Sequence, residues 1–263
     1  MMELFPNDGI DYYDSINREC SPPQMNCYLF GVDGTLTPPR TKIDSSFETF
    51  FLSWVKNKKV YLVTGSDVSK LKEQIPQGIL AECSGIFTSM GNEFWKGEEL
   101  VYRNDFTPPV ELKEMLISFQ MYTRFPVRIK KGGRGAIIEN RPGMINFTTI
   151  GRNADTEERN RYCEWDRKHK ERENIAKEIE NKFPELEIRI GGQISVDIQP
   201  RGYNKSQASE WIRLNEDKLR IIFFGDSLSK NGNDADAAQD ILAHGGTVHS
   251  VGSYLETRKM LSC

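Results

Sequence analysis

Four short segments of the chain combine glycines with side chains suited to phosphate and metal chemistry. In chain order they are 31–35 (Gly-Val-Asp-Gly-Thr), 64–67 (Thr-Gly-Ser-Asp), 202–205 (Gly-Tyr-Asn-Lys) and 225–227 (Gly-Asp-Ser), the last followed by 232–234 (Gly-Asn-Asp). One glycine and one aspartate after a strand are often only a turn, but here four polar segments follow one another. Lysines and carboxylates neutralise a phosphoryl group and hold its metal ion. The pattern therefore favours a site for a small phosphorylated molecule.

These segments must be brought together by the elements around them, which alternate between strand and helix. The sequence predicts strands over 27–30, 60–63 and 219–224, and helices over 45–57, 68–74 and 206–214. Ser66 and Asp67 are residue types that cap a helix beginning at Val68. Alternation at this spacing is typical of a parallel sheet covered by helices. Because the carboxyl ends of parallel strands meet at one edge, the four segments are expected to converge there.

Residues 105–204 do not continue the alternation of strand and helix, and we call them the insert. A helix is predicted over 110–122, with short strands over 127–130, 136–139, 144–148, 187–190 and 194–198. The longest predicted helix, 156–183, contains eight Lys or Arg and eight Asp or Glu residues, so its net charge is zero. Intermixed charges indicate a solvated helix face and not a nucleic-acid surface. The expected fold class is α/β, a parallel-sheet core that carries an α+β insert.

The overall composition excludes several other classes of protein. The net charge of −3 and the pI near 5.8 show no excess of positive charge that would favour binding to nucleic acid or to an anionic membrane. No apolar run approaches the roughly 18–20 residues that span a bilayer. Five cysteines without a Cys-x-x-Cys pair predict free thiols in the cytoplasm. Residues 1–25 carry turn signals without periodicity, which predicts an irregular N-terminal extension.

The first segment resembles the catalytic loop of the haloacid-dehalogenase (HAD) superfamily, where an aspartate nucleophile holds the position of Gly31. The insert resembles the cap of eukaryotic-type phosphomannomutases. Motifs that follow in the same order carry this likeness, namely Arg-Pro-Gly-Met-Ile-Asn (141–146), Ile-Gly-Arg (150–152), Thr-Glu-Glu-Arg (156–159) and Gly-Gly-Gln-Ile-Ser-Val-Asp (191–197). The likeness covers residues 27 to 252. It implies a HAD-like Rossmannoid core over 26–104 and 205–263 and a cap over 105–204 that supports a homodimer.

The resemblance also implies roles for particular residues. Around the substrate it places Arg40 from the core, Arg141, Arg152 and Arg159 at the phosphate held by the insert, and Ser195 and Asp197 beside the sugar. At the reacting phosphoryl group it places Lys205, Asp33 as general acid/base, and Mg²⁺ bound by Asp226 and the backbone carbonyl of Asp33. Asp240 would belong to a second cation loop. Planar arginines suit phosphate, so a sugar bisphosphate would find one phosphate site in the core and one in the insert.

Gly31 has no side chain with which to attack phosphorus or bind a metal ion. Loss of a nucleophile that acts in concert with other groups costs on the order of 10⁶ in rate. We therefore expect a phosphomannomutase-family isomerase of GDP-mannose biosynthesis that binds mannose 6-phosphate and mannose 1-phosphate but interconverts them very slowly. The alternatives are an inactive hexose-phosphate-binding protein or heterodimer subunit, a HAD sugar phosphatase, and a residue at position 31 that is not the natural one.

Overall fold

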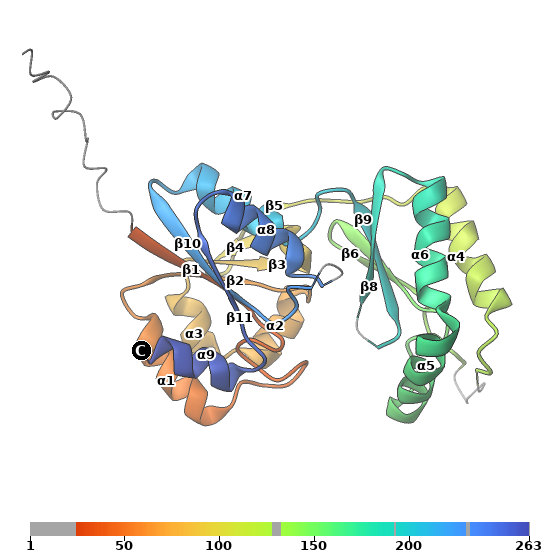
Figure 1. The fold of residues 1–263 in the computed structure, drawn as a ribbon, viewed down its shortest axis with the longest axis horizontal. Coiled ribbons are helices and arrows are strands. Elements are labelled where there is room, and N and C mark those ends of the chain that lie inside the picture. The colour runs from red at the N-terminus through yellow and green to blue at the C-terminus, as the bar shows by residue number, and fades with distance from the viewer. Residues whose placement is uncertain (1–24, 128–132, 192, 230–231, 263) are drawn as a thin grey trace, which may run out of the picture.

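A computed structural model describes residues 25–127, 133–191, 193–229 and 232–262. The irregular extension expected over 1–25 lies outside the described residues except for Met25, and so does most of the strand predicted over 127–130. The described elements form two groups that lie side by side, a larger core and the insert (Figure 1).

The core is built on a seven-stranded sheet in the order β11-β10-β1-β2-β3-β4-β5. Its strands are β1 (Met25–Gly31), β2 (Lys59–Val63), β3 (Gly85–Thr88), β4 (Glu93–Lys96), β5 (Glu99–Arg103), β10 (Leu219–Gly225) and β11 (Thr247–Ser250). The five strands from β11 to β3 pair in parallel, which confirms the parallel sheet expected from the sequence. The antiparallel extension by β4 and β5 was not predicted.

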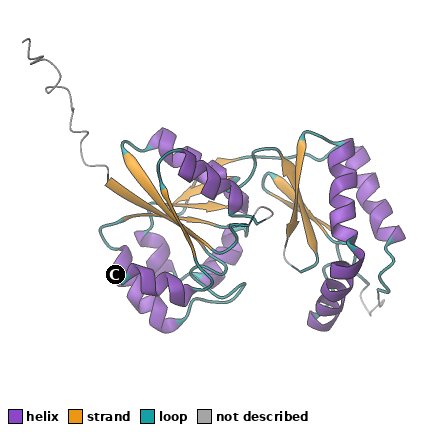
Figure 2. Ribbon diagram, in the orientation of Figure 1, coloured by secondary structure: helices purple, strands orange, loops and turns teal. Residues whose placement is uncertain are grey.

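Helices cover both faces of this sheet (Figure 2). They are α1 (Ser45–Val55), α2 (Val68–Gln74), α3 (Gln77–Glu82), α7 (Ser206–Asn215), α8 (Ala235–Ala243) and α9 (Tyr254–Leu261), with a short 3₁₀ turn, η1 (Ser89–Gly91). Successive residues of β1 pack on opposite sides, with Phe30 against Phe47 and Phe51 of α1 and Leu29 in the cluster that includes Ile212 of α7. This alternation is the period of a strand buried on both faces.

The insert is a four-stranded sheet in the order β6-β7-β9-β8 with helices on one face. Its elements are α4 (Val110–Tyr122), β6 (Ile138–Arg141), β7 (Met144–Phe147), α5 (Thr156–His169), α6 (Glu171–Lys182), β8 (Leu186–Gly191) and β9 (Ser195–Pro200). Leu112 and Leu116 of α4 and Ile175 and Ile179 of α6 form one buried cluster with the sheet. The helices lie on the side away from the core, so the open sheet face is turned toward it (Figure 1).

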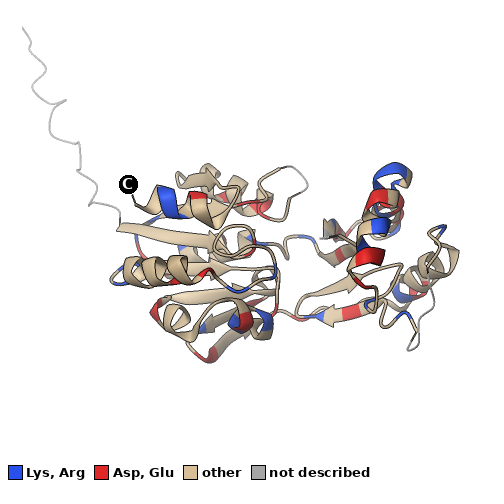
Figure 3. Ribbon diagram, turned by 90° about the horizontal axis from the view of Figure 1, so that it is seen from below, with Lys and Arg blue, Asp and Glu red and all other residues tan. Residues whose placement is uncertain are grey.

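The single long helix predicted over 156–183 is wrong, because the chain forms two helices that meet at Lys170. Lys170 has a left-handed backbone, with φ 57°, which ends α5. Asp166 accepts hydrogen bonds from the backbone N–H and the Nε of Arg172, at 3.0 and 2.8 Å, and this buried pair fixes the corner. Basic and acidic residues alternate along these helices, as expected for a solvated face (Figure 3).

Two contacts tie the insert to the core. Arg189 of β8 donates through Nη2 to Asp236 of α8 at 2.7 Å. On the other side, the β6–β7 turn lies directly on the side chain of Asn92, because a Cβ added at Gly143 would overlap that amide. None of the helices in the described part of the chain is long and apolar enough to cross a membrane.

Candidate functional site

The carboxyl ends of β1, β2 and β10 and the open face of the insert sheet enclose a cavity of about 550 Å³. The residues that line it are Val32, Asp33, Pro39, Arg40, Thr64, Gly65, Ser66, Asp67, Lys70, Met90, Glu139, Arg141, Asn146, Arg152, Ser195, Asp197, Lys205, Asp226, Ser227 and Asn233. The four polar segments therefore converge as the sequence predicted. Most of the residues singled out by the resemblance are brought together here; Gly31, Arg159 and Asp240 are not in the lining.

Gly31 is the last residue of β1 and is buried directly behind the loop that enters the cavity. A Cβ added there would lie 3.0 Å from the Thr35 Oγ1, 3.5 Å from the Phe224 carbonyl oxygen and 3.6 Å from the Thr35 Cβ. The Thr35 hydroxyl is fully buried and has no hydrogen-bond partner among the described residues. A buried hydroxyl without a partner costs about 1–3 kcal/mol. The unpaired Thr35 hydroxyl therefore lies next to the position that the Cβ of a side chain at residue 31 would occupy.

Asp33 is held at the core wall by two donors. Its Oδ1 accepts from the Gln74 Nε2 at 2.8 Å and from the Arg40 backbone N–H at 2.6 Å. Arg40 itself has a left-handed backbone, with φ 59°, a conformation that is unfavourable for a non-glycine residue. The Asp33 hydrogen bond helps to compensate for this strain. As a result the carboxylate of Asp33 and the guanidinium of Arg40 both reach the cavity.

Lys205 and Asp234 form a buried ion pair at the base of the cavity. The Lys205 Nζ donates to the Asp234 Oδ1 at 2.6 Å, and Asp234 also accepts from the Ser227 backbone N–H at 3.0 Å. Burial alone would raise the pKa of Asp234, but the charge and hydrogen bond of Lys205 hold it below its ordinary value. The pair fixes the position of the Lys205 amino group beside the ends of β1 and β10.

Asp226 follows β10 and faces the same base. Burial first, and then the nearby charge of Asp234, raise the pKa of Asp226 to about 6. Gly34 has φ 75°, and a Cβ on it would overlap the Asp226 carboxylate, so only glycine allows this approach. The carboxylates of Asp226 and Asp234 lie close together, and a bound cation would reduce the repulsion between them.

On the insert side, Glu139 bridges two arginines. Its Oε2 lies 3.1 Å from the Arg141 Nη2 and 2.6 Å from the Arg152 Nη2. Burial alone would raise the pKa of Glu139, but the hydrogen bonds and charges of both arginines keep it below its ordinary value. The Nε atoms of Arg141 and Arg152 are buried and have no hydrogen-bond partner in the described ranges. Each guanidinium therefore has one buried donor that is left unpaired in the described part of this structure.

The residues that the resemblance places beside the sugar come from the insert sheet. Asn146 of β7 and Asp197 of β9 are directly opposite each other, and the Asn146 Nδ2 donates to the Asp197 Oδ1. The Arg152 Nη2 donates to the Asn146 Oδ1 and so joins this pair to the arginines. Burial is the main influence on Asp197 and raises its pKa, although the charge of Arg141 opposes the shift. Ser195, at the start of β9, also lines the cavity.

Arg159 and Asp240 lie outside the cavity lining. Arg159 donates to the carbonyl oxygens of Ala154 and Arg152, at 2.8 and 3.3 Å. Burial, and then the charges of Arg40 and Arg152, lower the pKa of Arg159, so these three cations lie near one another. Asp240 accepts from the Ser209 hydroxyl at 2.5 Å and from Arg213 at 2.8 Å. Asp240 is thus paired within the core, and the second cation implied by the resemblance stays a prediction.

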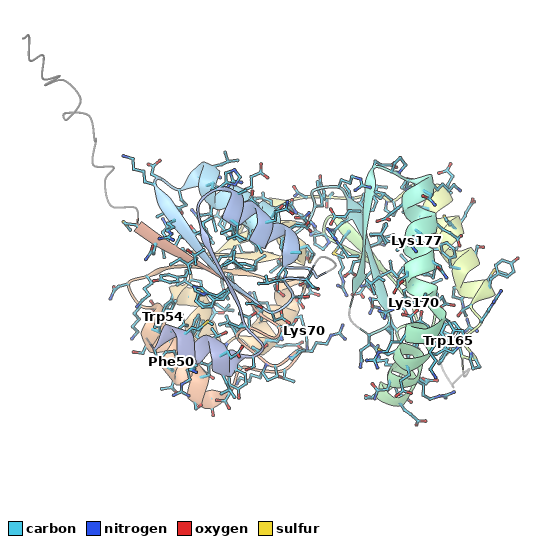
Figure 4. The ribbon with its side chains drawn as sticks, viewed as in Figure 1. Phe50, Trp54, Lys70, Trp165, Lys170 and Lys177 are labelled. Atoms are coloured by element: carbon cyan, nitrogen blue, oxygen red, sulfur yellow. The ribbon has the colours of Figure 1, made fainter. Side chains whose placement is uncertain are left out.

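Three polar lining residues were missed by the sequence reasoning, namely Lys70, Glu139 and Asn146. Lys70 extends from α2 on the side of the core that faces the insert (Figure 4). Asn146 lies within the quoted motif 141–146, and Glu139 precedes Arg141 by two residues. The available signal was the two-residue spacing of Glu139 and Arg141, which places both side chains on one sheet face. Asn146 lies directly opposite Glu139 on the paired strand.

The contact of Gly143 with Asn92 leads to a stability prediction. We expect Gly143→Ala to lower the free energy of unfolding by about 1–3 kcal/mol more than Gly202→Ala does. Both glycines have left-handed backbones, but a Cβ at Gly202 meets nothing within 4 Å. Urea denaturation of the two variants therefore separates the steric overlap from the backbone cost. Equal losses would show that the turn moves off Asn92 freely.

The sequence model of eukaryotic phosphomannomutase matches residues 47–262. The chain belongs to the eukaryotic phosphomannomutase family. The phosphomannomutase of Drosophila melanogaster is 37% identical over 220 residues, covering 81% of this chain and 85% of the relative. That of Dendrobium officinale is 35% identical over 239 residues, covering 88% and 92%. Phosphomannomutase 1 of Mus musculus is 35% identical over 229 residues, covering 84% and 86%.

Solved structures place this phosphomannomutase-family chain in the HAD fold. A HAD subclass IIB sugar phosphatase is similar with a TM-score of 0.54 at 19% identity, covering 90% of this chain and 98% of the other. A haloacid dehalogenase-like hydrolase from Bacteroides thetaiotaomicron gives a TM-score of 0.57 at 12% identity, covering 91% and 99%. These likenesses confirm the expected fold class, a HAD-like core with an inserted cap.

Proposed function

We propose that the chain binds mannose 6-phosphate and mannose 1-phosphate in the cavity between core and insert, and that Gly31 leaves their interconversion strongly impaired. The observation that carries this proposal is the presence of cationic groups on two opposite walls. Lys205 lies at the core wall, while Arg141 and Arg152 lie at the insert wall with unused buried Nε donors. A molecule with a phosphate at one end, or at both ends, matches this arrangement.

Each wall would contribute a distinct function. Lys205 would neutralise the phosphoryl group nearest the core, and the arginines would hold the distant phosphate with planar paired donors. Asp197 and Ser195 would contact sugar hydroxyls between them. Asp33 would exchange a proton with the sugar hydroxyl, since its carboxylate reaches the cavity and is held by Gln74.

The residues at the base of the cavity fit a divalent cation, which we take to be Mg²⁺. It would be held by Asp226 and the backbone carbonyl of Asp33, and it would supply positive charge beside the phosphoryl oxygens. Its positive charge would also offset the burial, and then the repulsion from Asp234, that raise the pKa of Asp226. The described ranges contain no group of three or more His, Cys, Asp or Glu side chains able to hold a metal ion. Carbonyl oxygens and water would therefore complete the ligand set.

Gly31 also supports a second function, in which the chain binds hexose phosphate without converting it. Such a protein would act as a pseudoenzyme or as one subunit of a heterodimer. An exposed apolar row on α4, formed by Val110, Ile117, Met121 and Tyr122, supports pairing through the insert, whether with a second copy or with an active relative. A sugar phosphatase is less favoured, because it would need the same missing nucleophile. A cytoplasmic location belongs to this proposal as a family expectation.

Calorimetry with Mg²⁺ present tests the binding part of the proposal. Mannose 6-phosphate is expected to bind, whereas mannose is not, and Arg152→Met should weaken the phosphate ligand at least 10-fold because a charge-assisted pair is worth about 1.5–3 kcal/mol. Arg167→Met, an exposed position on α5 outside the cavity, is the matched control and should bind like the unchanged chain. Equal affinity for mannose and mannose 6-phosphate would refute the proposed site.

A further inference from the structure

We infer that Glu139 is an anionic placeholder in the arginine site of the insert, released when a phosphate group binds there. This inference rests on the proposed function, because it concerns the same arginine pair. A single carboxylate oxygen, Oε2, contacts the Nη2 atoms of both Arg141 and Arg152. No other carboxylate among the described residues forms an ion pair with either arginine.

The contact uses only part of what the arginines offer. A guanidinium presents Nε–H and one Nη–H along the same edge, and an oxyanion can accept from both at once. Glu139 takes the Nη2 donors, while the two Nε donors stay buried and unpartnered in the described part of the chain. A phosphate has enough oxygens to accept from both edges together. It would therefore satisfy donors that the carboxylate leaves unpaired.

Arg152 is held by contacts other than Glu139, and the backbone of Arg141 is fixed by strand pairing. The Arg152 side chain donates to Asn146, and its backbone N–H donates to the Ala136 carbonyl oxygen at 3.0 Å. Arg141 closes the paired end of β6 opposite Met144. Glu139 therefore acts as a placeholder and not as a positioning residue. Removal of a positioning residue would misalign the guanidinium groups.

Exposure indicates which partner can move. The Glu139 side chain is 40% exposed, whereas those of Arg141 and Arg152 are 21% and 20% exposed. Glu139 can turn toward water at low cost, while the arginines remain in the wall. A weakly binding anion does not offset the free energy of displacing Glu139 from the arginines, whereas a phosphate dianion does. Glu139 would thus make the empty site selective against weakly bound anions.

The test compares Glu139→Gln with the matched control Glu187→Gln. Glu187 lies in β8 of the same sheet, pairs with Arg189 and does not line the cavity. Glutamine keeps the size and the oxygen of glutamate but removes the competing charge. By calorimetry, Glu139→Gln is expected to bind inorganic phosphate on the order of five-fold more tightly than the unchanged chain. Glu187→Gln is expected to leave this affinity unchanged.

Unchanged or weakened phosphate binding by Glu139→Gln would overturn the inference, and weakened binding would assign Glu139 a positioning role. If no variant binds inorganic phosphate, the arginine pair is not an anion site and the inference falls. Mannose 6-phosphate is titrated in parallel. If it fails to bind while inorganic phosphate still binds Glu139→Gln more tightly, the proposed function fails and the placeholder stands.

Discussion

Replacing Gly31 with aspartate is expected to raise the turnover of mannose 1-phosphate by several orders of magnitude. The reason is that a concerted nucleophile contributes on the order of 10⁶ in rate, while the rest of the cavity is already assembled. The backbone of Gly31 is not left-handed, and the new Cβ would require Thr35 to shift by only a few tenths of an ångström. The Thr35 hydroxyl would also gain an acceptor. A coupled assay of mannose 6-phosphate formation measures the gain.

Gly31→Asn is the control for this prediction, because asparagine has nearly the same shape as aspartate but cannot form the acyl phosphate. It should leave turnover at the level of the unchanged chain. Gly31→Asp should also form a phosphoprotein that is labile to hydroxylamine. Turnover by the unchanged chain equal to that of Gly31→Asp would show that position 31 is not the nucleophile position.

Replacing Lys205 with methionine is expected to lower the free energy of unfolding by about 3–5 kcal/mol. The substitution would leave the carboxylate of Asp234, which is fully buried, without its charge partner. The Ser227 backbone N–H would remain as a donor but cannot neutralise the charge. Urea denaturation, monitored by the intrinsic fluorescence of the tryptophans, measures the loss.

The double variant Lys205→Met/Asp234→Asn separates charge burial from lost packing. It should recover most of the stability that Lys205→Met loses, since no unpaired charge remains in the interior. Both variants should lose hexose-phosphate affinity, because each lacks the cation at the base of the cavity. A double variant as unstable as the single one would mean that the packing of the lysine stem, and not the ion pair, stabilises this region.

The core of the fold was predictable because its signals are local and repeated. Short apolar strands followed by capped helices gave the parallel sheet, and α2 begins and ends at the residues predicted, Val68 and Gln74. The corner at Lys170 was not predictable from periodicity, because the apolar stripe continues across it. What breaks the helix there is a tertiary pair between Asp166 and Arg172 and one left-handed residue. The antiparallel strands β4 and β5 were missed because β5 is largely exposed and has no alternation to detect.

The candidate site was predictable where a residue type points to its chemistry by itself. Aspartates and a lysine after strands indicated a phosphate site, the family resemblance added Arg141 and Arg152, and the structure brings Asp226 and both arginines to one cavity. Glu139 and Asn146 could not be recognised in this way. Their importance lies in which side chains they contact, and those contacts depend on the register of β6 and β7. The same limit applies to Asp240, whose charge is met by Arg213 of a neighbouring helix.

The gathering of Arg159 from the insert and Arg40 from the core has a mechanical consequence. Their charges repel each other, which is part of why the pKa of Arg159 is lowered. This repulsion opposes the contacts that join the insert to the core, which include the Arg189–Asp236 pair and the contact of Gly143 with Asn92. A dianion between them turns the same pair of cations into an attraction. The bound phosphate would then act as part of the scaffold, because it sets how tightly the insert closes over the core.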